Sequence, residues 1–258
     1  MKKSILILLM LLPFLAFAQR AYYCPPCGSS CDTTAYAKPG KCPMCGMELV
    51  LEDKATYIKN AKPVKVLFYL QDGVEILDFA GPMEVFTDAG FDVSIVSKTK
   101  DPIKSQGVLK IIPDYSIADA PPADIIAFFG GNTGNATGDT SVIKWLKNAP
   151  VPTYYFSVCT GAFILGKAGF LDGLTVTTFH ESIDGLRQAV PKAKVLSNVR
   201  FVDNGKIMTT AGISAGIDGA LHLVSKIHGP DAAYAVVKYM EYDKYVPEQG
   251  LILNKPTP

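Results

Sequence analysis

The chain contains 258 residues, of which 48% are hydrophobic and 19% are charged. This composition excludes a disordered, collagen-like or highly charged binding chain. The chain has 25 Lys and Arg against 24 Asp and Glu, so its formal net charge is +1. It therefore lacks the excess of basic residues that would indicate a nucleic-acid partner. Because domains commonly contain about 150 residues, the length allows one large domain with a small module beside it.

The first 18 residues have the pattern of a secretory signal peptide. Lys2 and Lys3 provide a positive start, an apolar run follows, and Ala16 and Ala18 form a small-residue cleavage site. A retained membrane anchor is the alternative, but spanning a bilayer needs about 20 apolar residues and Pro13 interrupts this run. We therefore expect cleavage after Ala18, export to the periplasm or the cell exterior, and no stable membrane anchor afterwards.

Residues 19–50 form a cysteine-rich module that holds five of the six cysteines. Four of the five make two C-x-x-C pairs, which are Cys24 with Cys27 and Cys42 with Cys45. Four thiolates in two such pairs are typical of a tetrahedral zinc site. Cys31 is a fifth thiol, either a spare ligand or an alternative to Cys27. Disulfide formation after export is one alternative to metal binding, and a zinc ribbon with a purely structural role is another.

The same segment resembles the short heavy-metal-binding domain of copper-transporting ATPases and metal-efflux adaptor proteins. The resemblance is carried by residues 38–49, Lys-Pro-Gly-Lys-Cys-Pro-Met-Cys-Gly-Met-Glu-Leu, and by Tyr-Cys-Pro at residues 23–25. Those domains usually have Met-His after the first Cys-Pro, where this chain has Pro26-Cys27. That departure favours zinc, while Met44 and Met47 keep Cu(I) as an alternative metal.

A polar connector at residues 51–62 leads into a region where apolar runs of strand length alternate with helical stretches. We predict strands at 64–70, 91–97, 124–129, 153–158, 175–179 and 207–210, shorter strands near Val195 and Phe201, and a hairpin at 107–112. We predict helices at 141–147, 161–168, 182–190, 214–227 and 230–242, and one opened by Gly81 and Pro82. Such alternation is typical of a parallel sheet covered on both faces. Residues 63–250 are therefore expected to form a three-layer α/β/α sandwich with a mostly parallel, flavodoxin-like sheet.

Cys159 stands where the strand at 153–158 ends and a helix begins. Ligands of open α/β sheets bind beyond the carboxyl ends of the strands, and Gly161 and Ala162 allow the tight turn of a nucleophile elbow. Unpaired helix N–H groups near the sulfur would favour the thiolate, so we expect a pKa for Cys159 below that of a free thiol. The alternative is a small buried hydrophobic residue, which is how most free cysteines behave.

Two further features follow predicted strands. Gly130 and Gly131 come directly after the buried strand at 124–129, and paired glycines can offer backbone N–H donors to an oxyanion. Asp78 lies in an apolar setting after the first strand, where desolvation would raise its pKa and allow it to donate a proton. An ordinary glycine turn and a helix-capping or surface carboxylate are the respective alternatives.

These features, in this order, resemble the ThiJ/PfpI family of the class I glutamine-amidotransferase-like superfamily, and within it the isonitrile-hydratase branch and the sensor domains of related transcription regulators. The resemblance extends over residues 64–242, and its most specific motifs are Leu-Asp-Phe-Ala-Gly-Pro-Met-Glu-Val at 77–85, Ser-Val-Cys-Thr-Gly-Ala at 157–162, Thr-Thr-Phe-His at 177–180 and the segment 210–218. It implies that Cys159 is the nucleophile, that Asp78 approaches its sulfur, and that Gly131 and Thr160 supply N–H donors. It also implies a homodimer.

Three positions refine this resemblance. The intracellular-protease branch has His directly after the cysteine, and Thr160 in that place argues against a Cys-His peptidase. His180 matches a recurrent family histidine, but its position after a different strand does not establish a catalytic pairing. Hydratase-like sequences commonly carry Trp where this chain has Glu181, so the wall of the site is expected to differ.

The sequence supports three functional hypotheses. In the first, the domain is a hydratase or hydrolase in which Cys159 attacks the electrophilic carbon of a small molecule such as an isonitrile. In the second, oxidation of the same cysteine makes the protein a redox or metal-stress sensor. In the third, the domain binds a ligand without turnover. None of them requires a cofactor in the α/β domain, and zinc or copper belongs to the N-terminal module.

Overall fold

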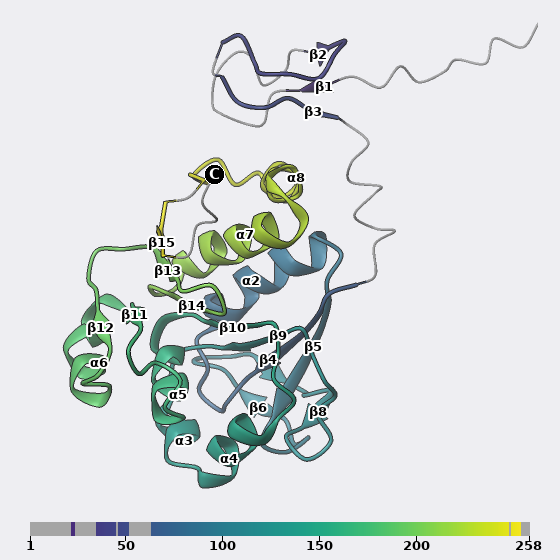
Figure 1. Cartoon of the computed structure of the whole chain (residues 1–258). Coiled ribbons are helices and arrows are strands. Elements are labelled where there is room, and N and C mark those ends of the chain that lie inside the picture. The colour runs from purple at the N-terminus through teal and green to yellow at the C-terminus, as the bar shows by residue number, and fades with distance from the viewer. Residues whose placement is uncertain (1–21, 24–34, 45, 52–62, 248, 254–258) are drawn as a thin grey trace, which may run out of the picture.

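The computed structural model describes residues 22–23, 35–44, 46–51, 63–247 and 249–253 (Figure 1). The predicted signal peptide at 1–18 lies outside these residues, as do residues 52–62 of the predicted connector. The expected boundaries of these segments therefore stay predictions. Among the helices in the described ranges, none has the length and apolar character needed to cross a bilayer.

Eight strands form the main sheet, in the order β15-β13-β14-β10-β9-β4-β5-β8. Their bounds are β4 Lys65–Tyr69, β5 Asp92–Ser97, β8 Tyr115–Ser116, β9 Ile125–Phe128, β10 Tyr154–Ser157, β13 Phe201–Asp203, β14 Ile207–Thr210 and β15 Leu251–Ile252. Neighbouring strands are parallel except β13 and β14, which are antiparallel. Every residue of β9 is buried, as expected for a strand covered on both faces.

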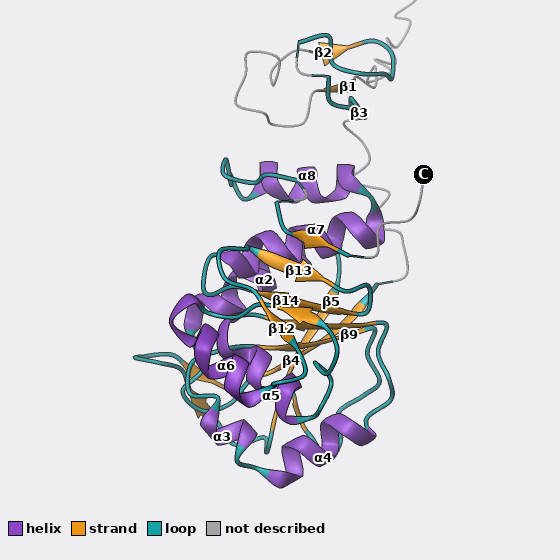
Figure 2. Cartoon of the chain, turned by 60° about the vertical axis from the view of Figure 1, so that its left-hand side comes forward, coloured by secondary structure: helices purple, strands orange, loops and turns teal. Residues whose placement is uncertain are grey.

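Helices cover the two faces of this sheet and make three layers (Figure 2). On one side lie α2 Ile76–Asp88 and α7 Ala215–His228, with α8 Pro230–Tyr239 packed on α7. On the other side lie α3 Gly134–Thr137, α4 Thr140–Asn148, α5 Ala162–Lys167 and α6 Ile183–Ala189. The three-layer α/β/α prediction with a mostly parallel sheet is therefore confirmed.

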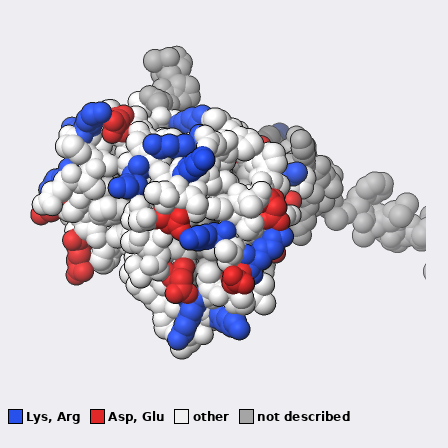
Figure 3. All heavy atoms as spheres, turned by 90° about the horizontal axis from the view of Figure 1, so that it is seen from below, with Lys and Arg blue, Asp and Glu red and all other residues white. Residues whose placement is uncertain are grey.

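Four short strands and a separate sheet complete the architecture. The strands β6 Ile103–Lys104 and β7 Lys110–Ile111 form the hairpin expected near residues 107–112, and β11 Thr175–Val176 pairs with β12 Lys194–Val195. In the N-terminal module, β1 Tyr22–Tyr23 pairs with β2 Ala35–Tyr36 and β3 Val50–Leu51. Acidic and basic side chains are interspersed over the face drawn in Figure 3, in keeping with the balanced charge.

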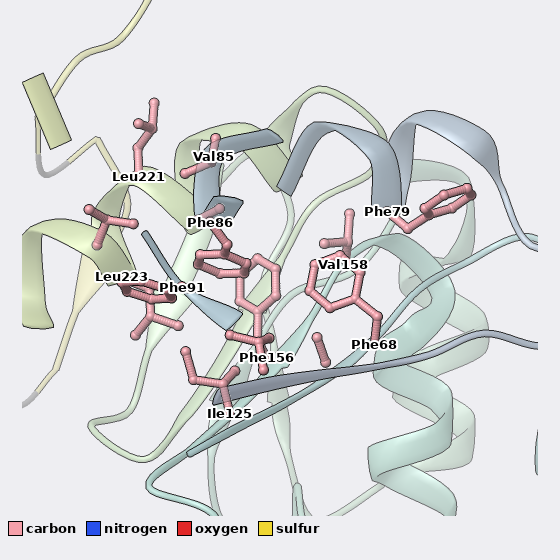
Figure 4. Packing of buried hydrophobic residues seen from close by; sticks show 14 of the residues in the cluster. Phe68, Phe79, Val85, Phe86, Phe91, Ile125, Phe156, Val158, Leu221 and Leu223 are labelled. Carbon is pink, nitrogen blue, oxygen red and sulfur yellow. The ribbon is translucent and has the colours of Figure 1, made fainter. Parts of the chain in front are cut away.

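The aromatic core between the sheet and α2 fixes the position of that helix (Figure 4). Phe68 of β4 and Phe156 of β10 each meet Phe86 of α2 edge to face, with ring centroids 6.0 and 5.9 Å apart. All three rings are fully buried, and burial of each contributes about 2–3 kcal/mol. This packing holds the last turn of α2, and Phe79 holds its first turn by meeting Phe129 edge to face, with ring centroids 6.4 Å apart.

The start of α2 differs from the sequence prediction. The helix was expected to open at Gly81 and Pro82, but it begins at Ile76 and contains Pro82 in its interior. Because proline has no backbone N–H, Pro82 donates no helical hydrogen bond to the carbonyl four residues earlier, which is that of Asp78. The apolar face of the helix already starts at Phe79, so tertiary packing extends it toward the strand. Asp78 therefore lies in the first helical turn and not in a loop.

Candidate active site

Cys159 occupies a strained turn at the carboxyl end of β10. It begins the short 3-10 helix Cys159–Gly161, which runs directly into α5. Its φ of 58° lies in the left-handed region, where a residue with a side chain is uncommon and strained. Gly161 is required in this turn because a Cβ there would lie 2.3 Å from the carbonyl oxygen of Phe128. The chain therefore makes the tight turn from strand to helix that Gly161 and Ala162 indicate in the sequence.

Two backbone contacts anchor the elbow on its neighbours. The N–H of Cys159 donates to the carbonyl of Ala211 at 3.0 Å. The hydroxyl of Thr178 donates to the carbonyl of Cys159 at 2.7 Å. Thr178 belongs to the segment predicted as a strand over 175–179, of which only Thr175–Val176 pairs in a sheet. The strand ends early because the following threonines bond to β14 and to the elbow.

Asp78 faces Cys159 from the first turn of α2 and is completely buried. Its Oδ2 accepts the N–H of Gly130 at 2.9 Å, and its Oδ1 accepts the N–H of Ile213 at 2.9 Å. The carboxyl also forms a hydrogen bond with the Cys159 thiol. Four segments that are far apart in the sequence thus meet at one carboxyl group and one sulfur atom.

The glycine pair has two different roles. A Cβ on Gly130 would lie 2.6 Å from Asp78 Oδ2 and 2.8 Å from Cys159 Sγ, so only glycine leaves room for these two groups to meet. Since Asp78 takes the N–H of Gly130, that donor is engaged before any ligand arrives. Gly131, at φ 88°, lines the cavity in front of the sulfur. Of the two predicted oxyanion glycines, Gly131 is the one placed to meet a ligand.

Thr160 and Gln71 support the sulfur and the glycine loop. The hydroxyl of Thr160 donates to the carbonyl of Gly131 at 3.4 Å, and hydrogen bonding from Thr160 to the sulfur lowers the pKa of Cys159. Gln71, which is buried, donates through Nε2 to the carbonyls of Phe129 and Gly130 at 3.1 and 3.0 Å. The sequence indicated Thr160, whereas Gln71 has no motif that would identify it.

Burial raises the pKa of both Asp78 and Cys159. It raises the pKa of Asp78 from 3.8 to about 6, against the opposing hydrogen bonds from Gly130 and Ile213. This is the direction expected from the sequence. Burial, followed by the charge of Asp78, raises the pKa of Cys159 to about 12. The sequence-based expectation of a lowered thiol pKa is therefore wrong for this structure, because desolvation outweighs the donors from Thr160.

A cavity of about 300 Å³ opens in front of Cys159. Its lining comprises Glu75, Gln106, Gly131, Cys159, Thr160, Phe179, Ser182 and Ile213. No sequence pattern indicated a site role for five of these residues, which are Glu75, Gln106, Phe179, Ser182 and Ile213. Glu75 could have been found, because it precedes Asp78 by three residues and helical spacing places such residues on one face. The cavity has the size of a site for a small molecule.

His180 lies outside this arrangement. Its side chain is 77% exposed, it does not line the cavity, and its Nε2 lies 3.8 Å from a carboxylate oxygen of Glu181. Glu181 itself is 74% exposed. The structure therefore places Asp78, and not His180, beside the cysteine.

The structure describes only part of the N-terminal module. Of the four predicted metal ligands, Cys42 lies within the described residues, and Cys24, Cys27 and Cys45 lie outside them. Cys42 is buried, and its Sγ lies 3.6 Å from the hydroxyl of Tyr36. The turn after it is closed by the N–H of Gly46, at φ 75°, donating to the carbonyl of Cys42 at 2.8 Å. A buried thiol on a tight glycine turn fits the role of a soft metal ligand.

Comparisons with known proteins agree with this geometry. Residues 64–226 match the DJ-1/PfpI family, and residues 21–51 match the heavy metal binding domain. The chain is 33% identical over 185 residues to the isonitrile hydratase of Pseudomonas putida, covering 69% of this chain and 78% of that protein. It is 24% identical over 199 residues to the HTH-type transcriptional regulator GbdR of Pseudomonas aeruginosa, covering 74% of this chain and 54% of that protein.

Solved structures show the same fold. A THiJ/PfpI family protein from Pseudomonas syringae superimposes with a TM-score of 0.67 and 27% identity over 72% of this chain and 78% of that one. Drosophila melanogaster DJ-1beta superimposes with a TM-score of 0.63 and 22% identity over 70% of this chain and 98% of that one. Both resemblances drawn from the sequence are confirmed, and the chain belongs to the DJ-1/PfpI family, with a heavy metal binding domain ahead of its α/β domain.

Proposed function

We propose that the α/β domain is a cysteine-dependent hydratase or hydrolase for small electrophilic carbon compounds, with isonitriles as the leading substrate class. The observation that carries this proposal is the pairing of Cys159 with Asp78 at the base of a small-molecule cavity. Similarity to the isonitrile hydratase of Pseudomonas putida supports the choice of substrate class. Thr160 stands directly after Cys159, where the intracellular-protease branch has a histidine, and this supports a hydratase over a peptidase.

The first chemical step forms a bond between Cys159 Sγ and the terminal carbon of the isonitrile. At neutral pH the thiol holds its proton and Asp78, with a pKa of about 6, is largely ionised. Asp78 therefore accepts the thiol proton as the sulfur attacks and passes it to the same carbon. The carbon–nitrogen triple bond becomes a double bond, which gives a thioformimidate attached to Cys159.

The second step consumes one water molecule. Water adds to the thioformimidate carbon while Asp78 accepts a proton from it, and the N–H of Gly131 and the donors of Thr160 stabilise the negative charge that develops. Asp78 gives this proton to the imine nitrogen. The carbon–sulfur bond then breaks, the proton of the added hydroxyl passes through Asp78 to Sγ, and an N-substituted formamide leaves. The net reaction adds one water to the isonitrile and restores both side chains.

Formamide production by the purified protein tests this proposal. Wild type should form N-substituted formamide from an alkyl isonitrile, and intact-mass measurement in a single turnover should detect the adduct on Cys159. Cys159→Ser and Asp78→Asn should lose turnover, whereas Glu84→Gln, an exposed carboxylate on the same helix, should retain it. Absence of both formamide and adduct across isonitriles and dicarbonyls would contradict the proposal.

A second candidate function is redox or metal-stress sensing through Cys159. The observation in its favour is that Thr160 follows Cys159 directly and its hydrogen bonding lowers the pKa of the thiol, and the same donors suit the oxygens of a sulfinic acid. Peroxide should then add oxygen atoms to Cys159 without any substrate turnover. Turnover with an unoxidised Cys159 would exclude this alternative as the main role.

For the N-terminal module we propose one divalent ion, zinc before copper, held by the thiolates of Cys24, Cys27, Cys42 and Cys45. The heavy metal binding domain match and the buried position of Cys42 support a metal in general. We further propose export after cleavage at Ala18, a homodimer, and a small-molecule substrate. Metal content of the purified protein tests the bound ion, N-terminal sequencing of the mature chain tests the cleavage, and the mass in solution tests the homodimer.

A further inference from the structure

The charges around the cavity are unbalanced. Its lining contains the carboxylate residue Glu75 and the thiol of Cys159, and no Lys or Arg belongs to it. Asp78 lies behind the thiol and adds a second carboxyl group. Within the described part of the chain, the cavity therefore offers negative charge to a ligand without a basic side chain to neutralise it.

Glu75 is held firmly by its backbone while its carboxylate has no structural task. Its N–H donates to the carbonyl of Gly130 at 3.2 Å. The residue stands at the N-cap of α2, yet its side chain forms no capping hydrogen bond. No ion pair is formed by Glu75 with the described basic residues, and the side chain is half-buried. Its negative charge acts within the site, because it contributes to the raised pKa of Asp78.

Phe179 adds an aromatic wall to the same cavity. Its ring is fixed closely against the backbone of Gly212, where a Cβ would lie only 2.4 Å from Phe179 Cδ2. An aromatic face together with a nearby carboxylate is a suitable environment for an organic cation, since both attract positive charge. The volume of about 300 Å³ restricts such a ligand to a small molecule.

We propose that Glu75 is a specificity-determining residue that selects electrophilic substrates carrying a positively charged group, such as a protonated amine or a quaternary ammonium. This inference rests on the proposed function, because it concerns the substrate class of the same site. Glu75 and the ring of Phe179 hold the cation while Cys159 meets the electrophilic carbon at the other end of the molecule. Anionic substrates are disfavoured by the same charge.

The test uses thiol reagents of matched size and different charge on the full-length protein. Methanethiosulfonates ending in a trimethylammonium or a sulfonate group transfer their thioalkyl part to a cysteine, and peptide mass spectrometry follows Cys159 separately from the cysteines of the module. Wild type should react faster with the cationic reagent after each rate is divided by its rate with free cysteine. Glu75→Gln should lower the cationic-to-anionic ratio by about tenfold, as expected for loss of one unit charge from a partly solvated cavity.

Glu84→Gln is the matched control, because it removes the same charge from an exposed position of α2 outside the cavity. An unchanged ratio in Glu75→Gln, or an equal drop in Glu84→Gln, would overturn the proposal. The readout requires only a reactive Cys159, so it does not depend on hydratase turnover. A shift in the ratio without formamide production would therefore support cation selection while refuting the proposed reaction.

A second measurement connects the charge preference with turnover. Isonitriles that end in a trimethylammonium or a tert-butyl group have similar size and differ in charge. Wild type should favour the cationic isonitrile in kcat/KM, and Glu75→Gln should remove this preference mainly through KM, because Glu75 binds the substrate and does not touch the reacting carbon. A preference for the neutral isonitrile in wild type would contradict the inference even if turnover is observed.

Discussion

Replacing Asp78 by Asn tests which group holds the proton between the carboxyl and the thiol. In the structure the ionised carboxyl of Asp78 disfavours the thiolate of Cys159, both through its charge and through its hydrogen bond to the thiol. The amide of Asn has nearly the same shape and no charge. The pKa of Cys159 should therefore fall in Asp78→Asn.

The size of this fall can be worked out from the geometry. Two unit charges about 4 Å apart interact by about 4 kcal/mol at an effective dielectric constant near 20, and one pKa unit corresponds to about 1.4 kcal/mol. The N–H groups of Gly130 and Ile213 already offset part of the carboxylate charge. Burial, the largest cause of the raised pKa, remains in the variant. We expect the pKa of Cys159 to fall from about 12 by about 1–2 units.

The assay is the alkylation rate of Cys159 by iodoacetamide as a function of pH, with the Cys159 peptide quantified by mass spectrometry. Glu84→Gln should leave the inflection of this profile unchanged. An inflection that moves upward in Asp78→Asn would show that Asp78 donates its proton to a thiolate. An unmoved inflection would show that the carboxyl has no electrostatic influence on the sulfur. Either result would refute the reasoning.

Three further predictions follow from the same geometry. The folded-state pKa of Asp78, about 6, exceeds its ordinary 3.8, so its contribution to stability is present below pH 4 and lost as pH rises through 6. Urea unfolding should therefore show wild type losing about 2–2.5 kcal/mol relative to Asp78→Asn between pH 4 and 7. In steady-state kinetics, Gly130→Ala should lower turnover at least tenfold, because its Cβ would separate Asp78 from Cys159. Gly185→Ala is the control and should keep turnover, because its Cβ would meet nothing nearer than 3.6 Å. Gly161→Ala should lower the free energy of unfolding by about 2–4 kcal/mol in the same urea titration, because its Cβ would strike the carbonyl of Phe128, and an unchanged midpoint would contradict the elbow geometry.

The elements of the site that were predictable are those marked by short-range patterns. Cys159 with Thr160 at a strand-to-helix turn, and the glycine pair after β9, each have a local backbone reason that the sequence displays. Asp78 was also predictable, because a carboxylate among apolar residues is unusual. The structure brings these residues together as the sequence suggested, since the carboxyl ends of parallel strands meet at one edge.

The remaining features depend on contacts between distant segments. Ile213 reaches Asp78 across 135 positions, and it does so through its backbone N–H, which no side-chain pattern reveals. Gln71 supports the glycine loop from 58 and 59 positions away. The direction of the Cys159 pKa shift was missed for the same reason, because the local helix terminus favours the thiolate while burial by distant elements opposes it more strongly.

Removing residues 1–60 should leave the α/β domain folded and Cys159 reactive while abolishing stoichiometric metal. Both large hydrophobic clusters of the described chain begin at or after Val64, whereas Cys42, Tyr36, Met47 and Leu49 form a small cluster of their own. A contact does join the parts, since the hydroxyl of Tyr234 in α8 lies 3.5 Å from Met47 Sδ. Because the α/β domain buries both large clusters by itself, losing this hydrogen bond, which contributes about 1 kcal/mol or less, should lower the thermal midpoint by no more than a few degrees. Calorimetry, metal content and the alkylation rate of Cys159 on the shortened and full-length chains measure the three outcomes. A shortened chain that fails to fold, or whose Cys159 no longer reacts, would mean that the module is part of the active unit, and full-length protein carrying disulfides in place of metal would favour an oxidised module.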